Sequence, residues 1–258
     1  MKSKVIDLYF FSGTGNTLLV SKEIKKYFEE NQFTVNLIRI EKSQHLEVDK
    51  SHTIGIAVPI AVQTTFPFCW SFINNLPETD EKTEVFLVTT RTMYSGGIIG
   101  PAKKILRKKG YITIGAKEIK MPSNFSPTKM FKLKNDDKKT SAGLIEARRF
   151  AHNLHYNITH WLDVNPVAGI VKKISLQKSF SWMRKHHKMY ANESKCIRCG
   201  LCFKLCPVDN IEMINYPEFK DTCQFCMRCY HFCPTDAIEM TNMQIRKYTA
   251  VKAEELLK

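Results

Sequence analysis

Short β-rich runs alternate with stretches of helical periodicity along the first 120 residues. The apolar runs are rich in β-branched and aromatic residues and cover positions 5–11, 33–40, 53–58, 85–90 and 111–119. Runs of this kind predict buried strands, and the spacing of Leu19, Ile24 and Phe28 predicts a helix after the first of them. A second helix is predicted over residues 98–109, with Gly110 closing it.

This βαβα order predicts an α/β doubly wound fold, in which a parallel sheet is covered by helices on both faces. A further helix is predicted over residues 140–162, with Phe150, Leu154 and Trp161 on its apolar side. Asn165-Pro166 ends that pattern. Residues 170–189 then form a basic amphipathic connector, whose apolar side either packs on a domain or meets a membrane surface.

The length of 258 residues favours one mid-sized domain with a small second one. No apolar run approaches the roughly 20 residues of a membrane-spanning helix, and the first residues lack the pattern of a secretory signal. We therefore expect a cytoplasmic protein. The formal charge is +14, and residues 100–190 hold 20 Lys or Arg against 5 Asp or Glu. This field is compatible with an acidic protein partner, an anionic small molecule, nucleic acid or a membrane surface.

Eight of the nine cysteines fall in a duplicated segment near the end of the chain. The two copies begin at Cys196 and Cys223, 27 residues apart, and agree at 9 of 18 positions. Dense cysteine in a chain without secretory features indicates metal binding rather than disulfides. The ninth, Cys69, lies among large apolar side chains and is expected to be a buried, inert thiol.

Each copy reads C-x2-C-x2-C-x3-C-P, the run in which three cysteines bind one iron–sulfur cluster and the fourth binds the other. One predicted [4Fe–4S] site therefore consists of Cys196, Cys199, Cys202 and Cys233. The other consists of Cys223, Cys226, Cys229 and Cys206. The alternative is structural zinc, although zinc sites use paired rather than fourfold cysteine spacing. Residues 191–242 resemble the two-cluster ferredoxins.

A glycine-rich turn follows the first predicted strand and opens the first helix. It contains Ser12, Gly13, Thr14, Gly15, Asn16 and Thr17. A helix N-terminus with added hydroxyl donors is a favourable anion site. Leu18 excludes the dinucleotide-binding fingerprint, and no Walker lysine follows. The turn resembles the phosphate loop of flavodoxins, which implies bound FMN and a flavodoxin-like fold; a chance Ser/Gly/Thr turn is the alternative.

Ligands of such folds bind beyond the carboxyl ends of the strands. Further flavin contacts are therefore expected from the next two strand ends, at Pro59, Ile60, Ala61, Thr90, Arg91, Met93, Tyr94, Gly96 and Gly97. Tyr94 or Met93 would stack on the ring, and the amides of Gly96 and Gly97 would face its polar edge. Flavodoxins are usually acidic with an aromatic platform, and this basic chain departs from both features.

Together the halves resemble the EFR1-type family of flavodoxin–ferredoxin fusions, to which residues 121–125 are also similar. The expected parts are a flavodoxin-like FMN domain (1–164), a basic linker (165–190), a small α+β two-cluster ferredoxin domain (191–242) and a tail (243–258). The resemblance implies an anaerobe's electron carrier that passes electrons between the clusters, FMN and a redox partner, which the basic charge suggests is acidic. Two alternatives remain open: an FMN-dependent reductase of a small molecule, and an iron–sulfur protein that binds nucleic acid.

Overall fold

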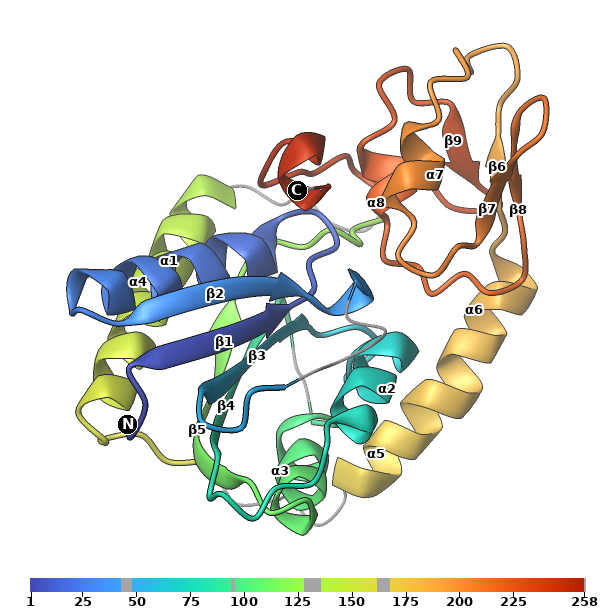
Figure 1. The fold of residues 1–258 in the computed structure, drawn as a ribbon. Coiled ribbons are helices and arrows are strands. Elements are labelled where there is room, and N and C mark those ends of the chain that lie inside the picture. Colours follow the sequence, from blue (N-terminus) through green and yellow to red (C-terminus); the bar gives the residue numbers. More distant parts are fainter. Residues whose placement is uncertain (43–47, 94–95, 128–135, 162–167, 258) are drawn as a thin grey trace. The chain divides into compact units, whose positions relative to one another are not determined.

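The computed structural model describes residues 1–42, 48–93, 96–127, 136–161 and 168–257 (Figure 1). The chain divides into two compact units. The first unit comprises Met1–Ser12, Asn16–Pro122 and Asn135–Leu176. The second comprises Gly13–Gly15, Ser123–Lys134 and Gln177–Lys258. The short segment Gly13–Gly15 thus belongs to the second unit, although its neighbours in sequence belong to the first.

The first unit is built on a five-stranded parallel sheet. Its strands are β1 (Val5–Phe10), β2 (Thr34–Arg39), β3 (Thr53–Pro59), β4 (Glu84–Arg91) and β5 (Ile112–Lys120). Every neighbouring pair is parallel, and the spatial order is β2-β1-β3-β4-β5. This is the strand order of flavodoxin-like folds, whose ligand site lies where the order reverses, between β1 and β3. The central strands β1, β3 and β4 are buried over nearly their whole length because helices cover both faces, whereas the edge strands β2 and β5 keep exposed positions.

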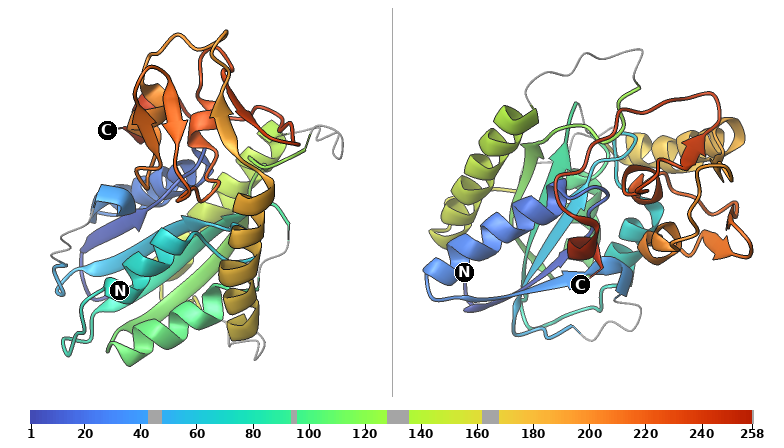
Figure 2. Two further views of the ribbon diagram at one scale, coloured as in Figure 1. Left: turned by 90° about the vertical axis from the view of Figure 1, so that its right-hand side faces the viewer. Right: turned by 90° about the horizontal axis from the view of Figure 1, so that it is seen from above.

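Helices flank this sheet on its two faces, as the views in Figures 1 and 2 show. On one side α1 (Asn16–Glu30) packs beside α4 (Asp136–His155). On the other side lie α2 (Pro67–Asn75) and α3 (Ile99–Lys108), and α5 (Ala168–Ile174) packs on α3. A short 3₁₀ turn, η1 (Ile40–Lys42), follows β2. The predicted doubly wound α/β fold is therefore confirmed.

Two helices differ from the sequence prediction. The predicted helix over 140–162 begins earlier, at Asp136, and ends at His155, where Asn157 takes the left-handed φ of 56°. Ile158 is consequently exposed, while Trp161 is buried outside the helix. Helix α2 was not predicted, because its short apolar run lacks a polar face; Pro67 opens it in the position that proline favours.

The second unit shows the sequence repeat in its secondary structure. In the first copy α7 (Leu201–Leu205) precedes β7 (Ile211–Met213), and in the second α8 (Arg228–His231) precedes β9 (Ile238–Met240). Antiparallel pairs join β7 to β8 (Pro217–Phe219) and β9 to β6 (Met189–Ala191). A small core lies between them, formed by Met189, Phe225, Met227, Tyr230, Ile238, Met240 and Ile245.

The repeat extends to the backbone conformation. Three pairs of positions 27 residues apart share a left-handed φ: Arg198 and Phe225, Gly200 and Met227, Asp209 and Asp236. A side chain in this region costs free energy, so the surrounding structure has to impose it. Both cysteine-bearing turns are therefore held in one shape despite their different residues.

The boundary between the two units falls within the predicted linker, which is helical over much of its length. After α5, a π-helical turn, η2 (Ser175–Ser179), leads into α6 (Phe180–His186). Phe180 is buried, whereas Ile170, Ile174 and Trp182 are exposed. The chain ends with a short 3₁₀ helix, η3 (Ala253–Leu256). No helix in the described ranges is long and apolar enough to cross a membrane.

Candidate functional site

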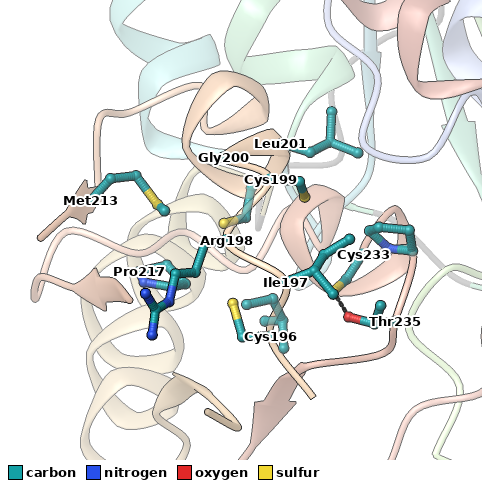
Figure 3. A pocket seen from close by; sticks show the side chains of 13 residues that line it. Cys196, Ile197, Arg198, Cys199, Gly200, Leu201, Met213, Pro217, Cys233 and Thr235 are labelled. Carbon is teal, nitrogen blue, oxygen red and sulfur yellow. Dashed lines mark hydrogen bonds between the residues drawn. The ribbon is translucent and has the colours of Figure 1, made fainter. Parts of the chain in front are cut away.

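One predicted cysteine quartet surrounds a cavity in the second unit (Figure 3). Cys196 and Cys199 lie on the turn that leads into α7, Cys202 lies within α7, and Cys233 lines the same cavity from the second copy. About 310 Å³ of empty space lies between the lining residues, part of it open to solvent. The remaining lining is largely apolar and includes Ile197, Leu201, Met213, Pro217, Pro234 and Ile238.

The other predicted quartet surrounds a second cavity, of about 390 Å³. Three of its cysteines, Cys223, Cys226 and Cys229, come from the second copy, and Cys206 comes from the first. Each copy thus sends its fourth cysteine to the cavity of the other, which is the crossed arrangement that the spacing predicts. The lining again contains apolar side chains, among them Met189, Val208, Ile211, Phe219 and Phe225.

The described side chains contain no group of three or more His, Cys, Asp or Glu arranged to hold a single metal ion. The quartets instead stand around open space. A [4Fe–4S] cube takes one thiolate at each of four separate iron corners, so its ligands stand apart from one another.

Burial disfavours the thiolate form of several of these cysteines. It raises the pKa of Cys202 and of Cys223 to about 11 and that of Cys226 to about 12. The pKa of Cys229 is raised well above its usual value by the same cause. Only the thiolate binds metal, so coordination to a cation has to supply the free energy of deprotonation.

The two crossing cysteines share a hydrogen-bond pattern. The Cys206 sulfur accepts a hydrogen bond from the backbone N–H of Asn210 at 3.2 Å, and the Cys233 sulfur accepts one from Ala237 at 3.2 Å. Burial raises the pKa of Cys233, but hydrogen bonds from the backbone at Thr235, Ile238 and Ala237 outweigh it and leave the pKa lowered. Donors of this kind stabilise a thiolate and tune a bound cluster.

The glycine-rich turn joins β1 to α1, and most of it is buried. The Thr14 hydroxyl, enclosed in the protein, has no hydrogen-bond partner within the described part of the chain. A buried hydroxyl without a partner is costly, and a bound phosphate would satisfy it. The Thr17 hydroxyl lies 2.8 Å from that of Thr90, while the Asn16 side chain donates to the Pro122 carbonyl at 2.8 Å.

The second unit's own residues cover Gly13–Gly15. The Ala250 N–H donates to the Thr14 carbonyl at 2.7 Å. A Cβ on Gly15, whose φ is +110°, would lie 2.7 Å from a Val251 methyl, and a Cβ on Gly13 would lie 2.6 Å from the Cys226 carbonyl oxygen. Close protein contacts therefore require both glycines. Sequence reasoning missed the role of these tail residues, because no local pattern links positions 250–251 to the turn.

Several of the other residues predicted to contact a flavin form hydrogen bonds with the protein backbone. Both Gly96 and Gly97 donate their N–H groups to the Gln63 carbonyl, at 3.2 and 2.9 Å. The expectation that these amides face a flavin edge is corrected accordingly, because the loop after β3 already occupies them. In that loop Ile60 donates to the Thr90 carbonyl at 2.8 Å, and Ala61 bridges to Thr64.

Two residues were predicted to stack on the flavin ring. Tyr94 lies outside the described residues, and Met93 is 69% exposed. The Arg91 guanidinium donates a hydrogen bond to the Met93 carbonyl and forms an ion pair with Glu118. Pro59 accepts a hydrogen bond at its carbonyl from the Thr65 hydroxyl. The described residues of this set lie at or just after the carboxyl ends of β3 and β4.

Comparison with known families identifies a 4Fe-4S binding domain at residues 189–212 and 217–239. The C-terminal part of the chain therefore contains an iron–sulfur domain. An uncharacterized polyferredoxin-like protein of Methanocaldococcus jannaschii is 71% identical over 24 residues. The match covers 9% of this chain and 10% of that relative.

Several flavoprotein structures are similar to this chain at low identity. A flavodoxin from the domain Archaea is 15% identical with a TM-score of 0.43, covering 60% of this chain and 99% of its own. The two-electron reduced flavodoxin of Megasphaera elsdenii is 19% identical with a TM-score of 0.38, covering 55% and 98%. Rubredoxin:oxygen oxidoreductase of Desulfovibrio gigas is 13% identical with a TM-score of 0.37, covering 61% and 38%. The fold assignment rests on the strand order rather than on these scores.

Proposed function

We propose that this chain is an electron-transfer protein that holds two [4Fe–4S] clusters and FMN and exchanges electrons with a redox partner. The observation that carries the proposal is that two separate cavities are each surrounded by one cysteine quartet. The crossing of Cys206 and Cys233 makes the two sites depend on each other. A family match to a 4Fe-4S binding domain over both copies supports the same assignment.

The chain's own residues suit the clusters. The lining of both cavities is largely apolar, although Cys199 is exposed, and the Asn210 and Ala237 N–H groups donate to the sulfur atoms of Cys206 and Cys233 and would offset the negative charge of a bound cluster. The left-handed residues of each turn orient three cysteines toward one cavity. When bound, the clusters carry electrons singly, whereas a flavin takes up one or two.

FMN is proposed at the turn between β1 and α1. The strand order supports a ligand site beside β1, and α1 is long enough, from Asn16 to Glu30, for its N-terminus to favour an anion. The unpaired Thr14 hydroxyl is the group that a phosphate would satisfy. In this proposal residues 1–164 bind FMN, 165–190 link the parts, 191–242 hold the clusters, and the tail from 243 to 258 covers Gly13–Gly15.

The cluster assignment is tested by metal analysis of anaerobically prepared protein. About eight irons and eight sulfides per chain are expected, with zinc absent. The Cys206→Ala variant should lose the cluster held by Cys223, Cys226 and Cys229 in preference to the other, as followed by iron content and electron paramagnetic resonance.

Cys69→Ala is the matched control, because it removes a buried thiol that lies in neither quartet. It should retain the full iron content. Stoichiometric zinc without labile sulfide in the wild-type protein, or equal iron loss in both variants, would contradict the assignment.

A further inference from the structure

The two copies of the repeat differ in charge at one equivalent position of the cluster sites. We call the cavity surrounded by Cys196, Cys199, Cys202 and Cys233 the first cavity, and the cavity surrounded by the other quartet the second cavity. Leu201 opens α7 and lines the first cavity, whereas Arg228, 27 residues later, opens α8 and lines the second. The preceding residues, Gly200 and Met227, share a left-handed conformation, so the two turns enter this position in the same way.

Arg228 is enclosed in the protein beside the second cavity. Its side chain is 2% exposed, and its Nη1 donates to the Leu205 carbonyl at 3.4 Å. Burial raises the pKa of Cys226 to about 12, and the positive charge of Arg228 opposes this rise. A guanidinium stays protonated in proteins, and a buried charge is screened much less than an exposed one. The charge of Arg228 therefore acts on a sulfur of the second quartet.

The first cavity has an arginine in a different setting. Arg198 lines it (Figure 3), but its side chain is exposed and donates to the Tyr216 hydroxyl at 2.9 Å. The equivalent position of the second copy is Phe225. Solvent and salt weaken the field of an exposed charge. Among the described lining residues, each cavity thus has one arginine, which is exposed at the first and buried at the second.

The second quartet is also the one whose thiolates are disfavoured most by burial. Burial raises the pKa of Cys223, Cys226 and Cys229, whereas in the first quartet Cys199 is exposed. Reduction adds one negative charge to a bound cluster, and an enclosed, apolar site makes added charge costly. A buried cation beside the second cavity lowers that cost.

We propose that Arg228 raises the reduction potential of the cluster held at the second cavity and thereby favours electron transfer onto it from the cluster at the first. One electron leaves the reduced cluster and enters the oxidised one, and no proton is transferred. The positive charge of Arg228 stabilises the negative charge that arrives. This inference rests on the proposed iron–sulfur function, because the potential belongs to a bound cluster.

The test measures the two midpoint potentials of the full chain, loaded with clusters under anaerobic conditions, by redox titration followed by electron paramagnetic resonance. Arg228→Leu introduces the residue that the first copy carries at the equivalent position. It should make reduction of one cluster roughly tenfold less favourable, which is about 59 mV for one electron, and leave the other potential unchanged. The affected titration step should be the one that Cys206→Ala removes.

Two further variants separate charge from other effects. Arg228→Gln removes the charge but keeps a side-chain N–H donor, and it should lower the same potential as Arg228→Leu does. Arg198→Leu is the matched control, because it removes the exposed arginine of the first cavity and should leave the potential at the second cavity unchanged. The effect of the Arg228 variants should persist at high salt, since a buried charge is poorly screened.

Wild-type potentials in Arg228→Leu, with iron and sulfide contents also unchanged, would overturn the inference. A wild-type potential in Arg228→Gln would assign the effect to hydrogen bonding and not to charge. Loss of the second cluster from both Arg228 variants would mean that Arg228 holds the site together, which would also contradict a role in the potential. Absence of iron and sulfide from the wild-type protein would instead refute the proposed iron–sulfur function.

Discussion

Thr14 and Thr17 have the same side chain in the same turn, yet their hydroxyls lie in different situations. The Thr17 hydroxyl already has a partner in Thr90, while that of Thr14 is buried without one. A buried hydroxyl without a hydrogen bond costs about 1–3 kcal/mol of folding free energy. This cost applies to Thr14 and not to Thr17. Thr14 is therefore the residue whose replacement separates phosphate binding from structural packing.

Thr14→Val should have opposite effects on stability and on FMN affinity. Without FMN the variant should unfold at the same or a higher denaturant concentration, because a buried polar group is replaced by an apolar one of similar size. FMN binding, followed by quenching of flavin fluorescence, should weaken roughly tenfold through loss of a charge-assisted hydrogen bond.

Thr17→Val is the comparison, because it breaks the Thr17–Thr90 contact and should lower stability. Unchanged FMN affinity in Thr14→Val would remove this turn from the proposed cofactor site.

At the scale of elements, the C-terminal tail and the glycine-rich turn form one packed unit. The tail reaches Thr14 through the Ala250 N–H, and Val251 occupies the space above Gly15. Beyond it, η3 is held by a hydrogen bond from the Lys252 backbone N–H to the Glu255 carboxylate at 3.1 Å and by the buried Leu256. If FMN binds at this turn as proposed, we expect its phosphate to displace the tail, because the tail packs against Gly15 through Val251.

Ala250→Pro should therefore make FMN bind faster and more tightly. Proline removes the N–H that donates to Thr14, which is worth about 0.5–1.5 kcal/mol, so the open fraction and the apparent affinity should rise roughly two- to tenfold. Stopped-flow fluorescence measures the association rate.

Ala253→Pro is the matched control, since position 253 opens η3, where proline is tolerated, and no hydrogen bond to the turn involves it. Weaker FMN binding in Ala250→Pro, with faster release, would mean that the tail stabilises bound FMN instead of competing with it for the turn.

At the scale of the whole molecule, charge is divided unevenly along the chain. Residues 100–190 carry a balance of +15, whereas residues 189–242 carry an excess of acids. The basic stretch is not uniformly a surface feature: Lys103 is buried and donates to the Trp161 carbonyl at 2.8 Å, and Lys109 donates to the Leu76 carbonyl at 2.7 Å. Lys104 and Lys108 are exposed on α3 and contribute to the field that an acidic partner would meet.

Reversing Lys104 and Lys108 to Glu should slow electron exchange with an acidic flavodoxin by roughly tenfold at low salt, because steering by opposite charge is lost. The wild-type rate should itself fall as salt rises, since screening acts over about 8–10 Å. Cluster content, measured by absorbance, should not change.

Lys26→Glu with Lys82→Glu gives the same change in net charge at exposed sites outside the basic stretch and serves as the control. Equal rates for the two double variants, independent of salt, would show that the basic stretch serves some other purpose.

Much of the architecture was predictable because it is encoded locally. The five strands lie within a residue or two of the apolar runs, since burial on both faces selects continuous β-branched and aromatic sequence. The cysteine motif predicted which four residues line each cavity: a tight turn brings three cysteines of one copy together, and the fourth, which precedes a proline, comes from the other copy. The 27-residue repeat likewise predicted two similar units.

Tertiary structure decided what depends on residues far apart in the chain. Whether the amides of Gly96 and Gly97 are available depends on the Gln63 carbonyl, and whether the turn at Gly13–Gly15 is open depends on Ala250 and Val251. The burial of Lys103 depends in the same way on Trp161. Periodicity indicates which side of a segment is buried. It does not indicate which distant backbone carbonyl accepts a hydrogen bond from a given donor, because that bond forms only when the two segments pack together.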